Sequence, residues 1–69
     1  MKKDIKSIRT QKGLTQAFVA DQVGISVISY QRIEYGTQRP NLQNALDIAK
    51  VLGTTVETLW GGNPTRAST

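Results

Sequence analysis

Glycines at positions 13, 24, 36 and 53 constrain the fold of this 69-residue chain more than any other feature, because each interrupts a segment of helical periodicity. Between them, apolar residues recur at the spacing of a helix face, and the alternation typical of strands is absent. The pattern predicts an all-α fold in one small domain. The expected helices cover about residues 4–12, 16–23 and 27–35, a stretch from Pro40 and Asn41 to Gly53, and the short segment TTVETLW.

Capping residues support the predicted starts of several helices. Thr15, Ser26 and Thr55 stand where the start of a helix needs a hydroxyl acceptor. The domain is expected to occupy residues 1–61, and residues 62–69 to form a disordered tail, whose composition fits either a linker or the end of a chain. The residues expected to face the core from the first, second and fourth helices are Ile5 and Ile8, then Val19, Ala20 and Val23, then Leu42, Ala45, Leu46, Ala49 and Leu52.

Two residue types that are common in zinc sites and in acid–base catalysis are missing. The chain has no cysteine and no histidine, so it lacks thiolate ligands, imidazole ligands and the commonest general base. Its five carboxylates include no close pair. An enzyme is therefore close to excluded, and no cofactor, metal ion or small-molecule ligand is expected.

Positive charge gathers in the first segment. Nine Lys and Arg against five Asp and Glu give a net charge of +4. Such charge attracts phosphate, although a solvated helix face is the simpler explanation of this feature taken alone. The start of the chain has no apolar signal segment and no apolar run could cross a membrane, so we expect a cytoplasmic protein. The clustered cations are Lys2, Lys3, Lys6, Arg9 and Lys12.

Residues 15–36 have the side-chain sizes that a helix-turn-helix requires. Gly24 supplies the tight turn with a residue that tolerates positive φ. Ala20 faces this turn, where a larger side chain would push the helices apart. In a helix-turn-helix the second helix of the pair lies in the major groove of DNA. The apolar residues expected to fix the angle between the two helices are Val19, Val23, Ile25, Tyr30 and Ile33.

The segment LTQAFVADQVGISVISYQRIEYGTQRPNLQNALDIAKVLGTTVETL resembles the DNA-binding domain of the phage-repressor, or Xre/Cro, helix-turn-helix family. The resemblance covers about residues 5–61. Its marks are LTQ at the second helix, Ala20, Gly24, RIEYG closing the third helix, the proline before the fourth and LDIAKVLG. It implies a compact five-helix, lambda-repressor-like domain that binds an operator as a symmetric homodimer, as in a repressor of phage or mobile-element type.

The third expected helix presents an apolar edge. Tyr30 and Ile33 set its core side, and at 100° per residue Ile28 then points away from the core while Val27 lies on the flank. Apolar side chains in these positions can pack against thymine C5-methyl groups. The alternative is a protein-interaction module, an antirepressor or antitoxin that holds its partner through Val27, Ile28 and Phe18.

Polar side chains would supply the rest of the readout. Arg32 can donate two hydrogen bonds to guanine, Ser29 can bond to several bases, and Gln31 can pair with adenine or reach a phosphate. The resemblance assigns base reading to the positions of Val27, Ile28, Ser29 and Arg32, which predicts T-rich steps beside a guanine. Gln16 and the loop before the fourth helix are expected to contact the DNA backbone. The complete set of expected DNA contacts is Gln16, Val27, Ile28, Ser29, Gln31, Arg32, Thr37, Arg39 and Asn41.

Five positions matter for the scaffold. By resemblance, Arg9 of the first helix and Glu34 of the third form a structural ion pair. Tyr30 replaces the usual branched aliphatic residue, and its hydroxyl needs a partner or an exit. Phe18 stands where this family commonly has glutamate, and it either packs on the first helix, which is the favoured interpretation, or is exposed and prone to association. Trp60 replaces leucine and belongs either to the core or to a dimer interface.

Taken together, the residues predict a sequence-specific regulator of transcription that binds double-stranded DNA. A repressor is the leading form, although the residues do not separate it from an activator. We expect a homodimer on a palindromic operator, with the third helix of each copy in the major groove and half-sites ~34–36 Å apart.

Overall fold

The computed structural model describes residues 4–61, and every regular element in that range is a helix. The expected all-α fold is therefore confirmed. Compared with the expected bounds, the first helix is one residue shorter at each end, because Asp4 caps it and Lys12 follows it. The tail expected at 62–69 lies outside the described residues. The helices are α1 Ile5–Gln11, α2 Gln16–Val23, α3 Val27–Tyr35, α4 Leu42–Leu52 and α5 Val56–Trp60.

Every helix begins with a capping side chain. The first backbone N–H groups of a helix have no partner within it, and a short polar side chain at the N-cap can accept one of them. In each case the acceptor bonds the N–H three residues further on, at distances from 2.7 to 3.1 Å. The five caps explain why such short helices start where they do, and they are Asp4, Thr15, Ser26, Asn41 and Thr55.

The core is built where α2, α3 and α4 meet. Its largest fully buried side chains are Tyr30, Ile48, Leu52 and Val19. Partly buried residues from the other segments, among them Ile8 and Trp60, pack around this cluster.

The buried face of α4 agrees with the expected one at Ala45, Ala49 and Leu52 and differs from it at Leu42 and Leu46. Leu42 is 72% exposed and Leu46 40% exposed, whereas Ile48 is fully buried. Ala45 and Ala49 lie in the middle of a broad apolar surface, so larger residues flank them on both sides and periodicity alone does not choose between the sides. Packing against α2 buries the side with Ile48 and Leu52 and leaves Leu42 and Leu46 exposed.

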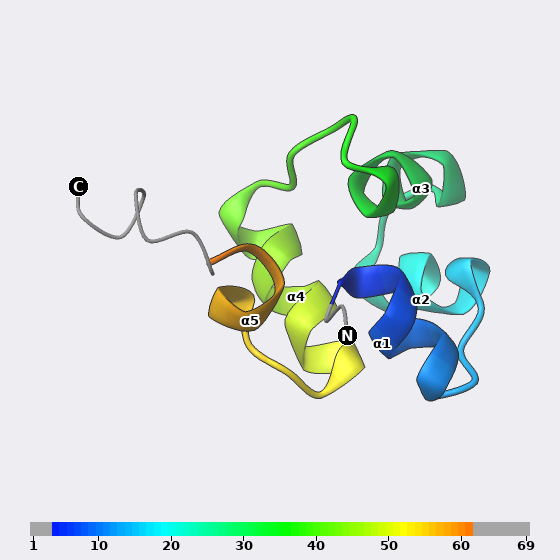
Figure 1. Cartoon of the computed structure of the whole chain (residues 1–69). Helices are drawn as coiled ribbons and strands as arrows, with labels where there is room; N and C mark the ends of the chain where they lie inside the picture. Colours follow the sequence, from blue (N-terminus) through cyan, green and yellow to red (C-terminus); the bar gives the residue numbers. More distant parts are fainter. Residues whose placement is uncertain (1–3, 62–69) are drawn as a thin grey trace.

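The arrangement leaves α3 at one edge of the molecule (Figure 1). The loop 36–41 runs from its end across to α4, and α5 lies beside α4, away from α3. No helix within residues 4–61 is long and apolar enough to span a membrane.

Candidate nucleic-acid interface

The turn between α2 and α3 fixes the position of the exposed helix. Gly24 adopts φ 87°, a left-handed conformation that side chains with a Cβ rarely take. The backbone N–H groups of Gly24 and Ile25 both donate to the carbonyl of Ala20, at 2.8 and 3.0 Å. Ala20 itself is 1% exposed, which leaves no space for a larger side chain at the turn. The sequence therefore holds α2 and α3 close together through this one short turn.

Ile28 and Val27 project from the start of α3 into solvent. Ile28 is 61% and Val27 38% exposed, while Tyr30 and Ile33 on the opposite side are buried. This is the orientation expected from helical geometry. Arg32 is exposed on the same helix. An exposed apolar side chain beside an exposed guanidinium suits a surface that reads both thymine methyl groups and guanine acceptors.

Glu34 of α3 is tied to α1 by the ion pair with Arg9. Arg9 Nε lies 2.8 Å from Glu34 Oε2, and Nη2 donates to Oε1 at 3.1 Å. The remaining Arg9 nitrogen, Nη1, donates to the carbonyl of Leu14 at 2.8 Å. Because Arg9 is 8% exposed and all its nitrogens are engaged, it braces α3 and does not offer a free charge to DNA.

Two further donors complete the surroundings of Glu34. The Tyr30 hydroxyl donates to Oε2 at 2.8 Å, which gives this unusual core tyrosine its partner. Gln16 Nε2 donates to Oε1, also at 2.8 Å. With Arg9, these donors fill about the four acceptor sites that a carboxylate has. Sequence reasoning found the ion pair but missed Gln16 and Tyr30 as partners of Glu34.

The Gln16 side chain also receives a hydrogen bond. Gln31 Nε2 donates to Gln16 Oε1 at 3.0 Å, so Gln16 bridges the Glu34 carboxylate and the half-buried Gln31 on α3. A phosphate contact from Gln16, as expected from its place at the start of α2, has to use its second amide hydrogen or the neighbouring backbone N–H groups.

The charge state of this group of side chains follows from its hydrogen bonds. Burial opposes ionisation of Glu34, but hydrogen bonds from Arg9, Gln16 and Tyr30 outweigh it and lower the pKa of the carboxyl below its usual 4.5. The hydrogen bond to Glu34 raises the pKa of Arg9. Burial, with the hydrogen bond to Glu34, raises the pKa of Tyr30, so its hydroxyl stays a donor at neutral pH.

The loop after α3 folds back onto the end of that helix. The backbone N–H groups of Thr37 and Gln38 donate to the carbonyl of Arg32 at 2.9 and 3.2 Å, and the Thr37 hydroxyl approaches the same oxygen at 3.3 Å. Arg39 is exposed. Asn41 uses its side-chain oxygen to cap α4, which leaves its amide nitrogen for any contact with a DNA backbone.

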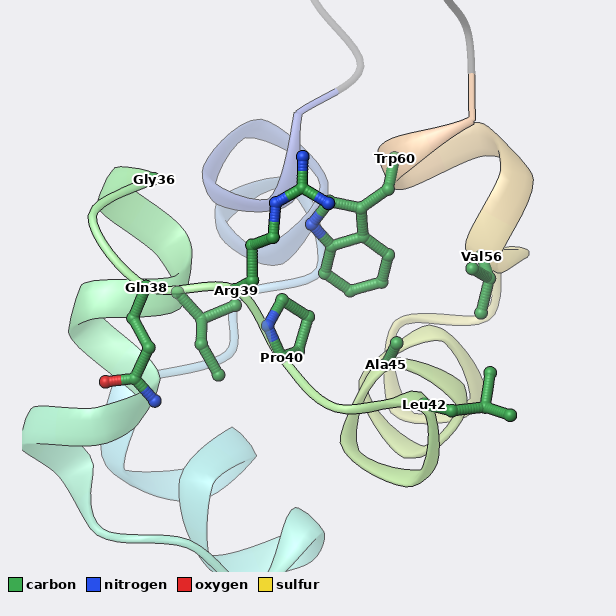
Figure 2. A pocket seen from close by; sticks show the side chains of 9 residues that line it. Gly36, Gln38, Arg39, Pro40, Leu42, Ala45, Val56 and Trp60 are labelled. Carbon is green, nitrogen blue, oxygen red and sulfur yellow. The ribbon is translucent and has the colours of Figure 1, made fainter. Parts of the chain in front are cut away.

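A hollow of about 400 Å³ lies between this loop and α5. Trp60 is half buried there: it packs against the core, which is the first of its two expected roles, and it also lines the hollow. Its place in a dimer interface stays a prediction. Figure 2 shows Arg39 and the Trp60 indole directed toward one another over this space. Its lining residues are Ile33, Gly36, Gln38, Arg39, Pro40, Leu42, Ala45, Val56 and Trp60.

Phe18 follows the second of its two expected roles, an exposed apolar side chain, and not the favoured one. Its side chain is 45% exposed, so it is not buried against the first helix. The Thr15 cap fixes the backbone at Phe18, whose N–H donates to the threonine hydroxyl at 3.0 Å, and the ring projects from the first turn of α2.

Comparison with known proteins places this geometry in context. Residues 5–59 match the helix-turn-helix family. The chain is 40% identical over 47 residues to the cryptic phage CTXphi transcriptional repressor RstR of Vibrio cholerae, over 68% of this chain and 42% of that protein. It is 32% identical over 59 residues to the uncharacterized HTH-type transcriptional regulator YqaE of Bacillus subtilis, over 86% of this chain and 51% of that protein.

A third relative comes from the same bacterium. The SPbeta prophage-derived uncharacterized HTH-type transcriptional regulator YonR is 33% identical over 58 residues, which cover 84% of this chain and 54% of that protein. The chain therefore spans about half the length of the curated relatives it matches. No solved structure matches the chain.

Proposed function

The chain belongs to the helix-turn-helix family, and from that premise we propose that it is a sequence-specific regulator of transcription that binds double-stranded DNA, in the form of a repressor of phage type. Its relatives are named as transcriptional regulators, one of them as a phage repressor, and none as an enzyme. This agrees with the absence of histidine and cysteine from the chain. The DNA-binding domain would occupy residues 1–61.

The observation that carries the proposal is the solvent-facing edge of α3. Ile28, 61% exposed, and the exposed Arg32 lie on a helix braced from behind by Glu34. In the major groove, Ile28 and Val27 would pack against thymine methyl groups, and Arg32 would donate to guanine O6 and N7. Ser29 and Gln31, both partly buried, would add polar contacts at the side of the helix.

Backbone contacts would surround this edge. Gln16 and the first backbone N–H groups of α2 suit a phosphate, because a helix N-terminus favours an anion. Thr37, Arg39 and Asn41 would contact the backbone from the loop 36–41. These contacts would set the register of α3 without reading sequence themselves.

The proposed assembly is a homodimer on a palindromic operator. Leu42 is 72% exposed at the rim of the hollow that Trp60 lines, so one surface offers both a protruding apolar side chain and a recess with apolar walls beside Gln38 and Arg39. Such a surface can be complementary to itself across a two-fold axis. Because the loop 36–41 forms one wall of the hollow, pairing there would hold the two α3 helices at a fixed spacing that the operator half-sites must match.

Selection of bound sequences from a random duplex pool tests the proposal. We expect a palindrome whose half-site has a guanine opposite Arg32 beside T-rich steps, and Arg32→Ala should remove the guanine preference. The logarithm of the affinity should fall linearly with the logarithm of salt concentration. Failure to enrich any sequence, together with binding that ignores salt, would contradict the proposal.

Exposed apolar residues on α2 and α3 favour a second candidate, a protein-interaction module such as an antirepressor or antitoxin. Phe18, Val27 and Ile28 are 45%, 38% and 61% exposed. A module of this kind would show no specific duplex binding in the same selection, and Phe18→Ser would weaken its hold on the partner protein. Under the leading proposal, Phe18→Ser should leave the selected operator unchanged.

A further inference from the structure

Three glutamine and glutamate side chains connect the interior of the domain to the exposed side of α3. Glu34 Oε1 accepts from Gln16 Nε2 at 2.8 Å, and Gln16 Oε1 accepts from Gln31 Nε2 at 3.0 Å. The Glu34 side chain is fully buried and Gln31 is partly exposed. The three residues therefore form a hydrogen-bonded relay from a buried carboxylate to the protein surface.

The direction of every hydrogen bond in this relay is set by Glu34. An ionised carboxylate can only accept, so Gln16 has to present its NH₂ group to it. Gln16 is then left with its carbonyl oxygen facing Gln31, and an oxygen can only accept there as well. Gln31 therefore has to turn its own NH₂ group inward.

Rotating either amide would be costly. A flipped Gln16 would place its carbonyl oxygen against the carboxylate of Glu34, and a flipped Gln31 would oppose two carbonyl oxygens. Arg9 and Tyr30 keep Glu34 in place and ionised with bonds of 2.8 Å to Oε2. The orientation of both glutamines is thus determined by the fold before any ligand arrives.

We infer that Gln31 is a specificity-determining residue that reads adenine, with its outward atoms preset by Glu34 through Gln16. This inference rests on the proposed DNA-binding function. Gln31 offers the outside a carbonyl oxygen and its remaining amide hydrogen. Adenine presents a donor, N6, beside an acceptor, N7, in the major groove, which is the matching pair.

The same preset orientation rejects guanine. Guanine presents two acceptors, N7 and O6, and the outward oxygen of Gln31 would face O6. A glutamine free to rotate could relieve that contact by presenting its NH₂ group, but Gln31 would first have to break its bond to Gln16. Discrimination between adenine and guanine at this base pair therefore depends on Gln16, which need not touch the base.

The experiment begins with selections from random duplexes by the wild-type chain and by Gln31→Ala. The base pair at which the wild type prefers adenine and the variant has no preference identifies the contact. Affinities are then measured for two duplexes that carry adenine or guanine at that pair. We expect a preference on the order of ten- to a hundredfold for the wild type and none for Gln31→Ala.

Gln16→Met tests the relay itself. Methionine keeps the length of the side chain and removes both polar atoms, while Glu34 Oε1 retains Arg9 Nη2 at 3.1 Å. We expect the adenine preference to fall several-fold toward none, although Gln31 is intact. Gln43→Ala is the matched control, since Gln43 is also a helical glutamine with a bonded partner, Asp47 at 3.0 Å, and should keep the full preference. Ile48→Val lowers the stability of the core and leaves the relay intact, so it should keep the adenine preference. It shows whether a loss of stability alone could reduce that preference.

The outcomes distinguish the inference from the function on which it rests. If the wild type selects an operator and Gln31→Ala selects the same one with every preference intact, Gln31 does not read a base and the inference is overturned. If Gln31→Ala loses the adenine preference but Gln16→Met retains it fully, Gln16 does not set the orientation of Gln31 and that part of the inference is overturned. If the wild type selects no sequence at all, the proposed function itself fails.

Discussion

At the scale of single residues, the apolar edge of α3 has the clearest consequence for binding. Ile28 has 61% of its side chain exposed, so replacing it with alanine removes three carbons from a surface that the free protein does not use for folding. We expect Ile28→Ala to leave the free energy of unfolding nearly unchanged. Its affinity for the selected operator should fall by about 1–2 kcal/mol, from roughly 0.8 kcal/mol per buried carbon discounted for incomplete burial.

Urea unfolding and duplex titration of the same preparations check this prediction. Ile33→Ala is the matched control on the same helix, because Ile33 is 3% exposed and its truncation should cost stability. Equal operator affinity for the wild type and Ile28→Ala would show that Ile28 does not contact DNA.

Glu34 predicts a pH dependence of stability. Its pKa is lower in the folded chain than the usual 4.5, because its hydrogen bonds outweigh the opposing effect of burial. A group of this kind contributes stability that is fully present above its unfolded pKa and is lost as pH falls through the folded value. We therefore expect the gap in unfolding free energy between the wild type and Glu34→Gln to be constant near neutral pH and to narrow below about pH 4.5.

Denaturant titrations of both proteins across this pH range measure that gap. Asp21→Asn is the control, since Asp21 is an exposed carboxylate on α2. A gap between the wild type and Glu34→Gln that stayed the same down to the most acidic sample would mean that the carboxylate gains nothing from its donors in the folded state.

At the scale of elements, substitutions of Gly24 in the turn before α3 should change stability through backbone strain and not through steric clashes. Gly24 has φ 87°, and a Cβ at that position would meet no atom within 4 Å. Gly24→Ala should therefore cost about 1–2 kcal/mol of unfolding free energy through left-handed strain alone. Gly24→Asn should cost less, because asparagine adopts this conformation more readily. Equal losses for the two variants in urea unfolding would point to a steric origin.

The bounds of the helices could be predicted because their causes are local. Thr15 and Gly24 delimit α2, and Ser26 and Gly36 delimit α3, as expected from capping and turn chemistry. The buried face of α4 could not be predicted in the same way. Its alanines carry apolar neighbours on both sides, and the choice between the side with Ile48 and the side with Leu42 and Leu46 is made by packing against α2, which is distant in sequence.

The candidate site also combines features that the local sequence predicts with features that depend on how the helices pack. The outward direction of Ile28 follows from helical geometry once Tyr30 and Ile33 are assigned to the core, and the structure has this orientation. The bond from Gln16 to Glu34 joins residues 18 positions apart and depends on how α2 crosses α3. No local pattern encodes that crossing, so the relay to Gln31 appears only in the folded chain.

At the scale of the whole molecule, the remaining prediction concerns pairing of two copies. Leu42 is 72% exposed beside the hollow lined by Trp60, and a large apolar side chain in solvent next to a partly apolar recess favours association. Leu42 is the first residue of α4, where an acidic side chain suits the helix N-terminus. Leu42→Glu should therefore keep the fold while placing a charge in the proposed interface.

We expect the wild type to bind a palindromic duplex as two copies with high apparent affinity. Leu42→Glu should bind it more weakly, on the order of tenfold or more, because a carboxylate that replaces leucine in the contact between the two copies loses its hydration there. Its affinity for a single half-site should fall by a much smaller factor, since α3 is unchanged and the new charge lies only beside the proposed backbone contact of Asn41. Gln11→Glu adds the same charge at an exposed position outside the hollow and should leave both affinities nearly intact. Sedimentation of the protein–duplex complexes gives the stoichiometry. If Leu42→Glu assembles on the palindrome as tightly as the wild type, the two copies meet through another surface, and the hollow beside Trp60 has no part in the spacing of the recognition helices.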